Sequence, residues 1–332
     1  MLNSIRLYNS AQTVQILTYR FMQMKYKMLV VFLAGMILNI VSIQAQDKDR
    51  ILRSDDGGKS WKPSAEGFPE ETMVSAFTID GGAILASAND KGLFISNDNG
   101  ESWSVTGKEL PANVRALAKH NGKLFASPWR SGVYVSQDHG KTWKACNFGL
   151  TDLEVNDFLS TEQGLFIGTS TGIFYSWNDG KTWMKILSAA QVNSLTQDGD
   201  IMLAATARGI YRSSNGARTW RQVVSNSGVK NIYHSEYGLF ATTHRDGLLR
   251  SMDGGKEWEL AENGLPELKK ATYSFIQSGN RLLIGQLDGT YYSTTHGIHW
   301  IKLDDLLGVT QMFALPNGVI LAVRLFANVD GC

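Results

Sequence analysis

An eight-residue motif returns seven times along the chain and limits what the chain can fold into. Its clearest copy is the segment 136–143, Ser-Gln-Asp-His-Gly-Lys-Thr-Trp, which reads Ser-x-Asp-x-Gly-x-Thr-Trp. The tryptophans that end the copies are separated by 42, 40, 40, 37, 38 and 42 residues; they are Trp61, Trp103, Trp143, Trp183, Trp220, Trp258 and Trp300. A period near forty residues with one strand-and-turn unit per period is typical of a repeat architecture.

The residue types of the motif are those that build a tight turn. Serine stands seven residues before every motif tryptophan. Five residues before it stand Asp56, Asp98, Asp138, Asn178, Asn215, Asp253 and Thr295. Such side chains accept nearby backbone N–H groups, and the glycine that follows takes up a positive φ. We therefore expect a turn in every copy, closed by a buried tryptophan ring, with looser turns where Ala217 replaces the glycine and where Thr295 replaces the acid.

Short β-strand patterns surround each motif. In the third copy the segments 114–118, 123–127 and 132–136 precede the turn, and a fourth follows the tryptophan, as in 183–187 of the next copy. Each segment is about five residues long, rich in strand-forming residues and bounded by turn residues. No ten-residue stretch after Gln46 has a helical period. Four antiparallel strands per repeat predict a propeller blade, so the chain is predicted to be an all-β, seven-bladed β-propeller.

The ends of the repeat region predict how the ring closes. The region opens at 50–54 with the pattern of a third strand, and it finishes at 309–313 and 318–322 with a first and a second strand. These two half-blades complement each other. We expect the strand near residue 320 to pair with the strand near residue 52, which removes two exposed sheet edges.

The N-terminal region has the pattern of an export signal. Residues 28–43 are an apolar run of 16 residues, with Lys25 and Lys27 before it and Ala45 shortly after it. A charged segment, a short apolar run and a small residue predict a signal peptide that is cleaved after Ala45. The run is shorter than the roughly 20 residues of a spanning helix, so a retained membrane anchor is the less favoured alternative.

With Met24 as the true start, the predicted organisation has three parts. They are an upstream extension over 1–23, a signal peptide over 24–45 and the propeller over 46–332. The predicted location is the periplasm or the exterior of the cell.

Composition argues against several function classes. Beyond residue 45 the chain carries 28 Lys and Arg against 31 Asp and Glu, which does not favour nucleic acid as a partner. No His or Cys pair has the spacing of metal ligands, and no phosphate loop or dinucleotide fingerprint is present, so neither a metal nor a cofactor is expected. The sequence leaves open whether Cys146 and Cys332 pair, and two free thiols are favoured. A closed ring hides its own edges, so a monomer is expected.

The motif resembles the Asp-box, or BNR, repeats of sialidases, sortilin-type receptors, xyloglucanases and the photosystem II assembly-factor group. The resemblance covers roughly residues 50–325 and implies the blade turn, but the same turn serves enzymes and binding scaffolds alike. Sialidases of this kind are six-bladed and carry an Arg-Ile-Pro segment, which this chain lacks. Xyloglucanases of this kind use two propellers, and this chain has room for one. The resemblance therefore points to the superfamily and to no specific member.

Propeller geometry places a ligand site on one face of the ring. The loops between second and third strands share a face with the connections between blades, and the motif turns lie on the opposite face. Candidate ligand-binding residues on these loops are Trp129, Arg130, Arg208, His244, Arg245, Asp246 and Asp288. Trp129 stands outside the register of the motif tryptophans, so it is available to stack on a sugar, and the arginines are suited to clamp an acidic group.

We therefore expect an exported, non-catalytic propeller that binds a protein or a glycan through its loop face. The alternative is a carbohydrate-active hydrolase of sialidase-like descent that uses acids such as Asp246 and Asp288. Paired catalytic carboxylates would have to lie about 5–10 Å apart. A third hypothesis is a structural domain that binds no ligand.

Overall fold

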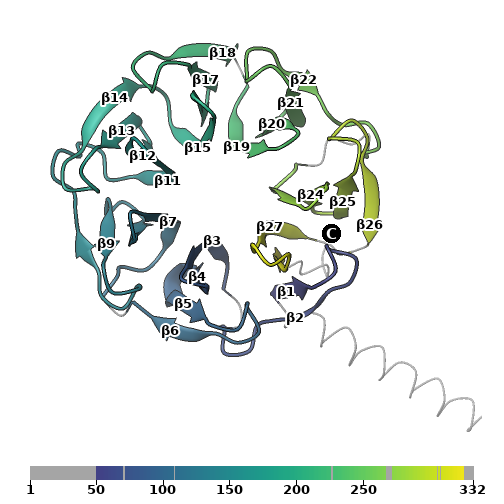
Figure 1. Cartoon of the computed structure of the whole chain (residues 1–332), viewed down its shortest axis with the longest axis horizontal. Coiled ribbons are helices and arrows are strands. Elements are labelled where there is room, and N and C mark those ends of the chain that lie inside the picture. Colours follow the sequence, from purple (N-terminus) through teal and green to yellow (C-terminus); the bar gives the residue numbers. More distant parts are fainter. Residues whose placement is uncertain are drawn as a thin grey trace, which may run out of the picture. The chain divides into compact units, whose positions relative to one another are not determined.

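The computed structural model describes residues 50–69, 72–107, 109–225, 227–266, 271–304, 306 and 308–324. These residues form a ring of seven four-stranded antiparallel sheets (Figure 1). The predicted all-β, seven-bladed propeller is confirmed. In the described part of the chain the one helical segment is a 3-10 turn, Asn89–Lys91, and no helix there is long and apolar enough to cross a membrane. The predicted extension, the signal peptide and Cys332 lie outside the described residues.

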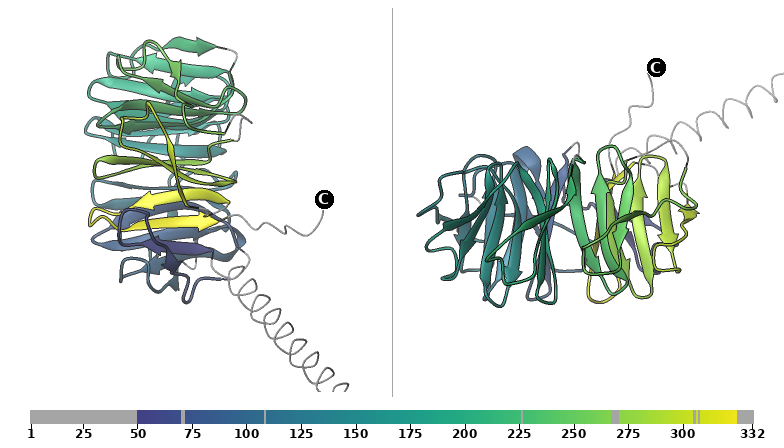
Figure 2. Two further views of the ribbon diagram at one scale, coloured as in Figure 1. Left: turned by 90° about the vertical axis from the view of Figure 1, so that its right-hand side faces the viewer. Right: turned by 90° about the horizontal axis from the view of Figure 1, so that it is seen from above.

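Six blades are continuous in sequence. In each of them the four strands follow one another in chain order from the central channel outward (Figures 1 and 2). Blade 1 contains β3 (Val74–Asp80), β4 (Ala83–Ala88), β5 (Gly92–Ser96) and β6 (Ser104–Thr106). Blades 2 and 3 contain β7 (Val114–His120), β8 (Lys123–Pro128), β9 (Tyr134–Ser136), β10 (Lys144–Ala145), β11 (Val155–Thr161), β12 (Gly164–Thr169), β13 (Gly172–Ser176) and β14 (Met184–Ser188). Blades 4 to 6 contain β15 (Val192–Asp198), β16 (Ile201–Thr206), β17 (Gly209–Ser213), β18 (Arg221–Ser225), β19 (Val229–Ser235), β20 (Gly238–Thr243), β21 (Leu248–Ser251), β22 (Glu259–Leu260), β23 (Ser274–Ser278), β24 (Arg281–Gln286), β25 (Gly289–Ser293) and β26 (Ile301–Asp304).

The seventh blade joins the two ends of the repeat region. It contains β27 (Val309–Ala314), β28 (Ile320–Arg324), β1 (Ile51–Ser54) and β2 (Lys62–Pro63), in this order from the channel outward. Leu52 of β1 is paired with Ala322 of β28 in an antiparallel register. The predicted closure is therefore confirmed, and neither terminal strand is left with an unpaired inner edge.

The core lies between the blades rather than within any one of them. Seven clusters of buried apolar residues fill the seven spaces between neighbouring sheets. In the space between blades 2 and 3, for example, Phe125 and Phe174 are fully buried beside Trp183. Burying one such side chain is worth about 1.5–3 kcal/mol. A single blade has no partner for its apolar faces, so the ring must form as a whole.

Each motif forms the same turn between the third and fourth strand of a blade. In all seven turns the serine hydroxyl accepts the backbone N–H four residues later at 2.8–3.1 Å. In all seven, the side chain two residues after the serine accepts the N–H four residues beyond itself at 2.9–3.1 Å. The turns at Ala217 and Thr295, expected to be looser, keep both bonds, and their serine bonds of 3.1 and 3.0 Å are the two longest of the seven. Ala217 adopts a φ of 62°, and the Thr295 hydroxyl replaces the carboxylate as acceptor.

In four turns the residue before the motif glycine reaches toward the preceding blade. It is in each case a non-glycine residue with φ between 56° and 61°. His139 Nδ1 lies 2.7 Å from Asp80 Oδ2 at the end of β3, and Asp179 accepts a hydrogen bond of 2.8 Å from Lys123 Nζ. A side-chain hydrogen bond joins Asn99 to Asn317, and the rings of His296 and Tyr237 stack on each other. The turn therefore closes its own blade and also ties that blade to its neighbour.

The shared turn predicts the effect of removing one serine hydroxyl. Ser136 is 1% exposed, and its hydroxyl accepts the Gly140 N–H at 2.9 Å. We expect Ser136→Ala to lower the free energy of unfolding by about 1–3 kcal/mol, because a buried N–H loses its acceptor. Urea unfolding checks this, with Lys141→Ala as the control in the same turn. Equal midpoints for the two variants would contradict the role given to the hydroxyl.

The turn acids predict a loss of stability in acid. The Ser60 hydroxyl holds the pKa of Asp56 well below its usual range, and the Thr142 hydroxyl does the same for Asp138. Burial works to raise the pKa of Asp98, but hydrogen bonds led by that of the Ser102 hydroxyl outweigh it and lower the pKa to about 2. Carboxylates of this kind stabilise the fold above about pH 4 and lose that contribution as the pH falls further.

Replacing the four turn acids with asparagine should remove this acid sensitivity. Asn178 and Asn215 already serve in two turns with the same backbone bond. The variant with Asp56, Asp98, Asp138 and Asp253 changed to Asn should lose less stability than the parent chain between about pH 4 and pH 2. Urea midpoints measured across that range test this. If the urea midpoints of the two proteins changed in parallel with pH, the prediction would be wrong.

Candidate functional site

The innermost strands carry a repeated irregularity that forms a ring of polar side chains. Six of the seven innermost strands have a register shift directly after a buried valine near their first residue. A bulge adds a residue to the strand and changes the direction of its side chains. The residues that follow the six valines are all polar: Ser75, Arg115, Asn156, Asn193, Lys230 and Thr310. They lie at the level of the loops between second and third strands, because Val74 pairs with Ala88 directly before such a loop.

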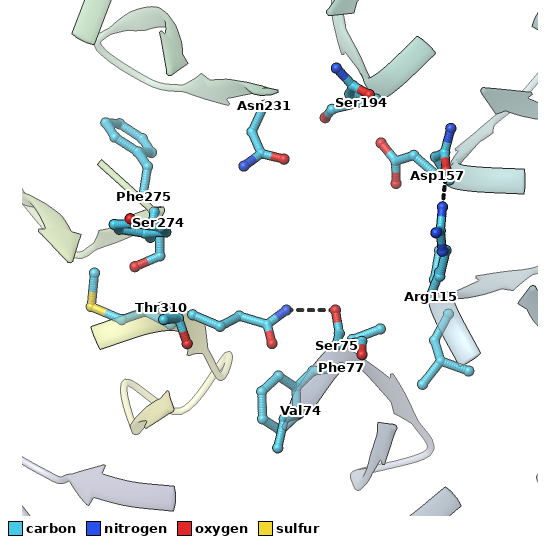
Figure 3. A pocket seen from close by; sticks show the side chains of 18 of the residues that line it. Val74, Ser75, Phe77, Arg115, Asp157, Ser194, Asn231, Ser274, Phe275 and Thr310 are labelled. Carbon is cyan, nitrogen blue, oxygen red and sulfur yellow. Dashed lines mark hydrogen bonds between the residues drawn. The ribbon is translucent and has the colours of Figure 1, made fainter. Parts of the chain in front are cut away.

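These strands enclose a cavity of about 480 Å³ in the central channel (Figure 3). All seven innermost strands contribute to its lining, mostly with amide, hydroxyl and aromatic side chains. Asp157 is the one carboxylate and Arg115 the one cation among the lining residues. The volume falls in the range of about 300–1,000 Å³ that is usual for small-molecule sites.

Hydrogen bonds run from blade to blade along one side of this cavity. Arg115 donates to Asn156 Oδ1 at 2.8 Å, and Asn156 Nδ2 donates to the Val192 carbonyl at 3.0 Å. Asn193 Nδ2 continues the series with a bond of 2.7 Å to the Val229 carbonyl. On the side of blades 2 to 5, the polar ring therefore also holds adjacent blades together.

Asp157 is the acid of the cavity, and its side chain is half-buried. Its two oxygens accept the N–H groups of Phe158 and Leu195 at 2.9 and 2.7 Å. Burial raises the pKa of Asp157 to about 6, although these hydrogen bonds act in the opposite direction. Burial also raises the pKa of Tyr233, and the nearby Asp157 carboxylate adds to that effect. Asp157 is therefore only partly ionised near pH 6.

The structure places Trp129 and Arg130 at the rim of this cavity. Trp129, in the loop between β8 and β9, is 47% exposed. The guanidinium carbon of Arg130 lies 4.9 Å from the centre of its ring, and that of Arg115 lies 5.7 Å away. Glu154 contacts both arginines, at 3.3 Å to Arg115 Nη1 and 3.7 Å to Arg130 Nε. Two predicted site residues are thus connected to the cavity through Arg115.

The other predicted site residues lie on loops of blades 4 to 6. Arg208 is exposed between β16 and β17, and His244, Arg245 and Asp246 are exposed between β20 and β21. Burial lowers the pKa of His244, and the positive charges of Lys230 and Arg245 add to this. Lys230 in turn lies 4.7 Å from the ring centre of Tyr273, which lines the cavity.

The two predicted acids do not enter the cavity. Asp246 Oδ2 accepts a bond of 2.5 Å from the Ser227 hydroxyl, and Asp288 Oδ2 accepts one of 2.9 Å from the Tyr291 hydroxyl. Neither acid belongs to the cavity lining. Among the described residues, no hydrogen bond or ion pair joins Trp129 or Arg130 to any of the predicted residues on blades 4 to 6.

Sequence reasoning missed the polar ring, with Arg115 and Lys230 among its members, and it missed Asp157 in the cavity lining. Its signal was nevertheless present, because a valine followed by a polar residue opens the first strand of six repeats. In the described chain, no group of three or more His, Cys, Asp or Glu side chains is arranged to hold a metal ion. Cys146 is a free cysteine whose pKa burial raises to about 12.

Comparison with known proteins identifies the type of repeat and finds the same fold in solved structures. The family model described as BNR/Asp-box repeat matches residues 134–145. No curated protein sequence matches the chain. The repeats and the ring together define a β-propeller of the BNR-repeat superfamily. They indicate no single member of it.

Three similar solved structures show how widely this fold is used. YCF48 from Cyanidioschyzon merolae is 14% identical with a TM-score of 0.60, over 77% of this chain and 96% of that one. The extracellular domain of BT4673 from B. thetaiotaomicron is 15% identical with a TM-score of 0.61, over 77% of this chain and 39% of that one. The GH74 xyloglucanase from Xanthomonas campestris is 15% identical with a TM-score of 0.63, over 79% of this chain and 52% of that one. At such identities the likeness shows a shared fold alone.

The raised pKa of Asp157 predicts a pH-dependent stability. The folded chain holds the Asp157 proton up to about pH 6, whereas an unfolded chain releases it near pH 4. The contribution of Asp157 to stability should therefore fall as the pH rises from about 4 to 6 and stay constant above about 7.

The comparison of Asp157→Asn with the parent chain tests this by unfolding at a series of pH values. The difference in unfolding free energy should move in favour of the variant between about pH 4 and 6. Ser75→Ala, a change at a cavity residue without a titratable group, is the control. A difference that does not vary with pH would refute the assignment.

Proposed function

We propose that this chain is an exported, non-catalytic propeller that binds a protein partner through the loop face around the mouth of its channel. The observation that carries this proposal is the cluster at the rim. Trp129 is half-exposed and lies against the guanidinium groups of Arg115 and Arg130, and Glu154 contacts both arginines.

The physics of protein interfaces supports this use of the cluster. Tryptophan and arginine dominate the residues that carry binding energy at such interfaces. The contacts with Arg115 and Arg130, which Glu154 holds by ion pairs, limit the motion of the Trp129 ring, so less entropy is lost when a partner covers it. Leu153, next to Glu154 in the chain, is 41% exposed and adds apolar surface.

The comparisons are consistent with binding and with export. YCF48 has also been solved bound to D1 peptide, in a structure 13% identical to this chain with a TM-score of 0.61. A propeller of this fold thus binds a polypeptide in that protein, which supports a polypeptide ligand here. The predicted signal peptide over 24–45 supports export, and the extracellular domain of BT4673 is a further example of the fold outside the cell.

The site geometry favours binding over glycoside hydrolysis. A glycosidase of the usual kind needs two carboxylates on either side of one bond. The cavity is lined by a single carboxylate, Asp157, whose oxygens accept backbone N–H groups. Asp246 and Asp288 lie on different loops and accept hydrogen bonds from Ser227 and Tyr291.

Capture of envelope proteins from the host by the immobilised chain tests the proposal. Trp129→Ala should weaken binding of the captured partner about thirtyfold, the equivalent of about 2 kcal/mol at an interface hot spot. Trp177→Ala is a matched control, since Trp177 is 55% exposed but lies in a motif turn on the opposite face. Equal weakening by both changes would contradict the proposed surface. Hydrolysis of sialosides or β-glucans at enzyme-like rates, lost in Asp246→Asn or Asp288→Asn, would favour the hydrolase instead.

A further inference from the structure

Three exposed apolar side chains gather at the outer edge of blade 3. Phe148, Trp177 and Met184 are 75%, 55% and 51% exposed. The Phe148 carbonyl accepts the N–H of Trp183, directly before Met184, at 2.9 Å. Met184 is paired with Tyr175, which stands two residues before Trp177. Because β14 is the outermost strand of its sheet, this apolar cluster lies on the outside of the ring (Figure 1).

The repeat does not require apolar residues at these three positions. At two other junctions between blades, the carbonyl that accepts the N–H of the motif tryptophan belongs to Glu66 and to Asn263. The residue after the motif tryptophan is charged or polar in five of the six copies other than that of Met184. At the position of Trp177 the other copies have Asp55, Asn97, Gln137, Ser214, Met252 and Thr294. Blade packing therefore does not explain the apolar cluster.

The surroundings of the apolar cluster are positively charged. The segments 134–150 and 172–188 carry four lysines against two aspartates and no other acid. Asp138 accepts hydrogen bonds within its own turn, and Asp179 accepts one from Lys123 of the preceding blade. All four lysines are exposed, and in the described part of the chain no carboxylate forms an ion pair with them; they are Lys141, Lys144, Lys181 and Lys185.

An apolar cluster surrounded by lysines fits a membrane surface better than a protein. Protein interfaces are depleted in lysine and use arginine as their cation. The rim around Trp129 has arginines, whereas the four cations here are all lysines. At a bilayer, a tryptophan ring lies at the level of the headgroups. Lysine reaches anionic headgroups with its charge while its apolar stem stays buried.

We propose that the apolar cluster of Phe148, Trp177 and Met184 docks on the surface of an anionic phospholipid bilayer. The apolar side chains enter the headgroup region, and the surrounding lysines bind the anionic headgroups. The proposal does not depend on the protein partner proposed above. Trp177 lies in a motif turn, and Trp129 lies on the opposite face, so a docked chain keeps its loop face open to a partner.

Co-sedimentation with vesicles tests the proposal. The chain is used from Gln46 onward, which contains all seven blades but omits the apolar run over 28–43. Vesicles of phosphatidylglycerol and phosphatidylcholine in equal parts should bind it at least about tenfold more strongly than vesicles of phosphatidylcholine alone, and added salt should weaken this binding. Absence of binding to the mixed vesicles, or equal binding to both kinds, would overturn the proposal.

Two matched pairs of variants locate the surface. Trp177 and Met252 both follow a motif serine and are 55% and 61% exposed, but Met252 belongs to blade 5. Trp177→Ala should lower the partition coefficient into mixed vesicles about tenfold, and Met252→Ala should leave it unchanged. Lys181→Gln should lower it about fivefold, whereas Lys256→Gln at the same motif position of blade 5 should not. Equal effects within either pair would refute the location.

A third comparison separates this surface from the protein-binding rim and from loss of folding. Trp129→Ala should keep vesicle binding, and the urea midpoint of Trp177→Ala should match that of the parent chain because the side chain is exposed. Loss of vesicle binding in Trp129→Ala would overturn the proposed position. Capture of a protein that Phe148→Ala abolishes, with no vesicle binding by the parent chain, would assign the apolar cluster to a protein partner instead.

Discussion

The hydrogen bond from the backbone N–H to the motif serine is the interaction on which the rest of the structure depends. All seven copies form this hydrogen bond, and its length varies by no more than 0.3 Å among them. It fixes two successive residues at positive φ, such as His139 and Gly140. The first of the two is directed at the preceding blade, and the tryptophan that follows packs against the same interface. A local turn thus sets the angle between sheets, and the angle sets how many sheets complete the circle.

Completion of the circle also creates the channel and its chemistry. The pairing of β1 with β28 brings the innermost strands of all blades to a common axis (Figure 1). Bulges at the same position of six strands then present polar side chains to that axis. Asn156 and Asn193 of this ring join adjacent blades, and on the other side of the channel Gln311 Nε2 bridges β27 and β3 through the Ser75 carbonyl. Blades of nearly identical backbone thus have different roles through one side chain each.

The fold could be predicted from the sequence because its determinants are local. The spacing of motif residues gives the blade number, and the strand types at 50–54 and 318–322 give the closure. The candidate site could be predicted only in part. Trp129 was identified because it breaks the tryptophan register, but Arg115 and Asp157 lie on strands whose alternation directs side chains at neighbouring blades. A bulge reverses that direction, and the sequence pattern does not reveal the bulge by itself. The residue types of the motif also did not predict that the Thr295 hydroxyl would take the place of the carboxylate as acceptor.

The closing blade has one more consequence. Arg324 at the end of β28 donates its backbone N–H to the Arg50 carbonyl at 3.0 Å, where every other blade has a loop between its second and third strands. Residues 50 and 324 therefore lie side by side at the level of the loops between second and third strands. A permuted chain that links residue 324 to residue 50 and opens within a motif turn would then hold its closing blade together by a covalent loop of the kind that the other six blades have.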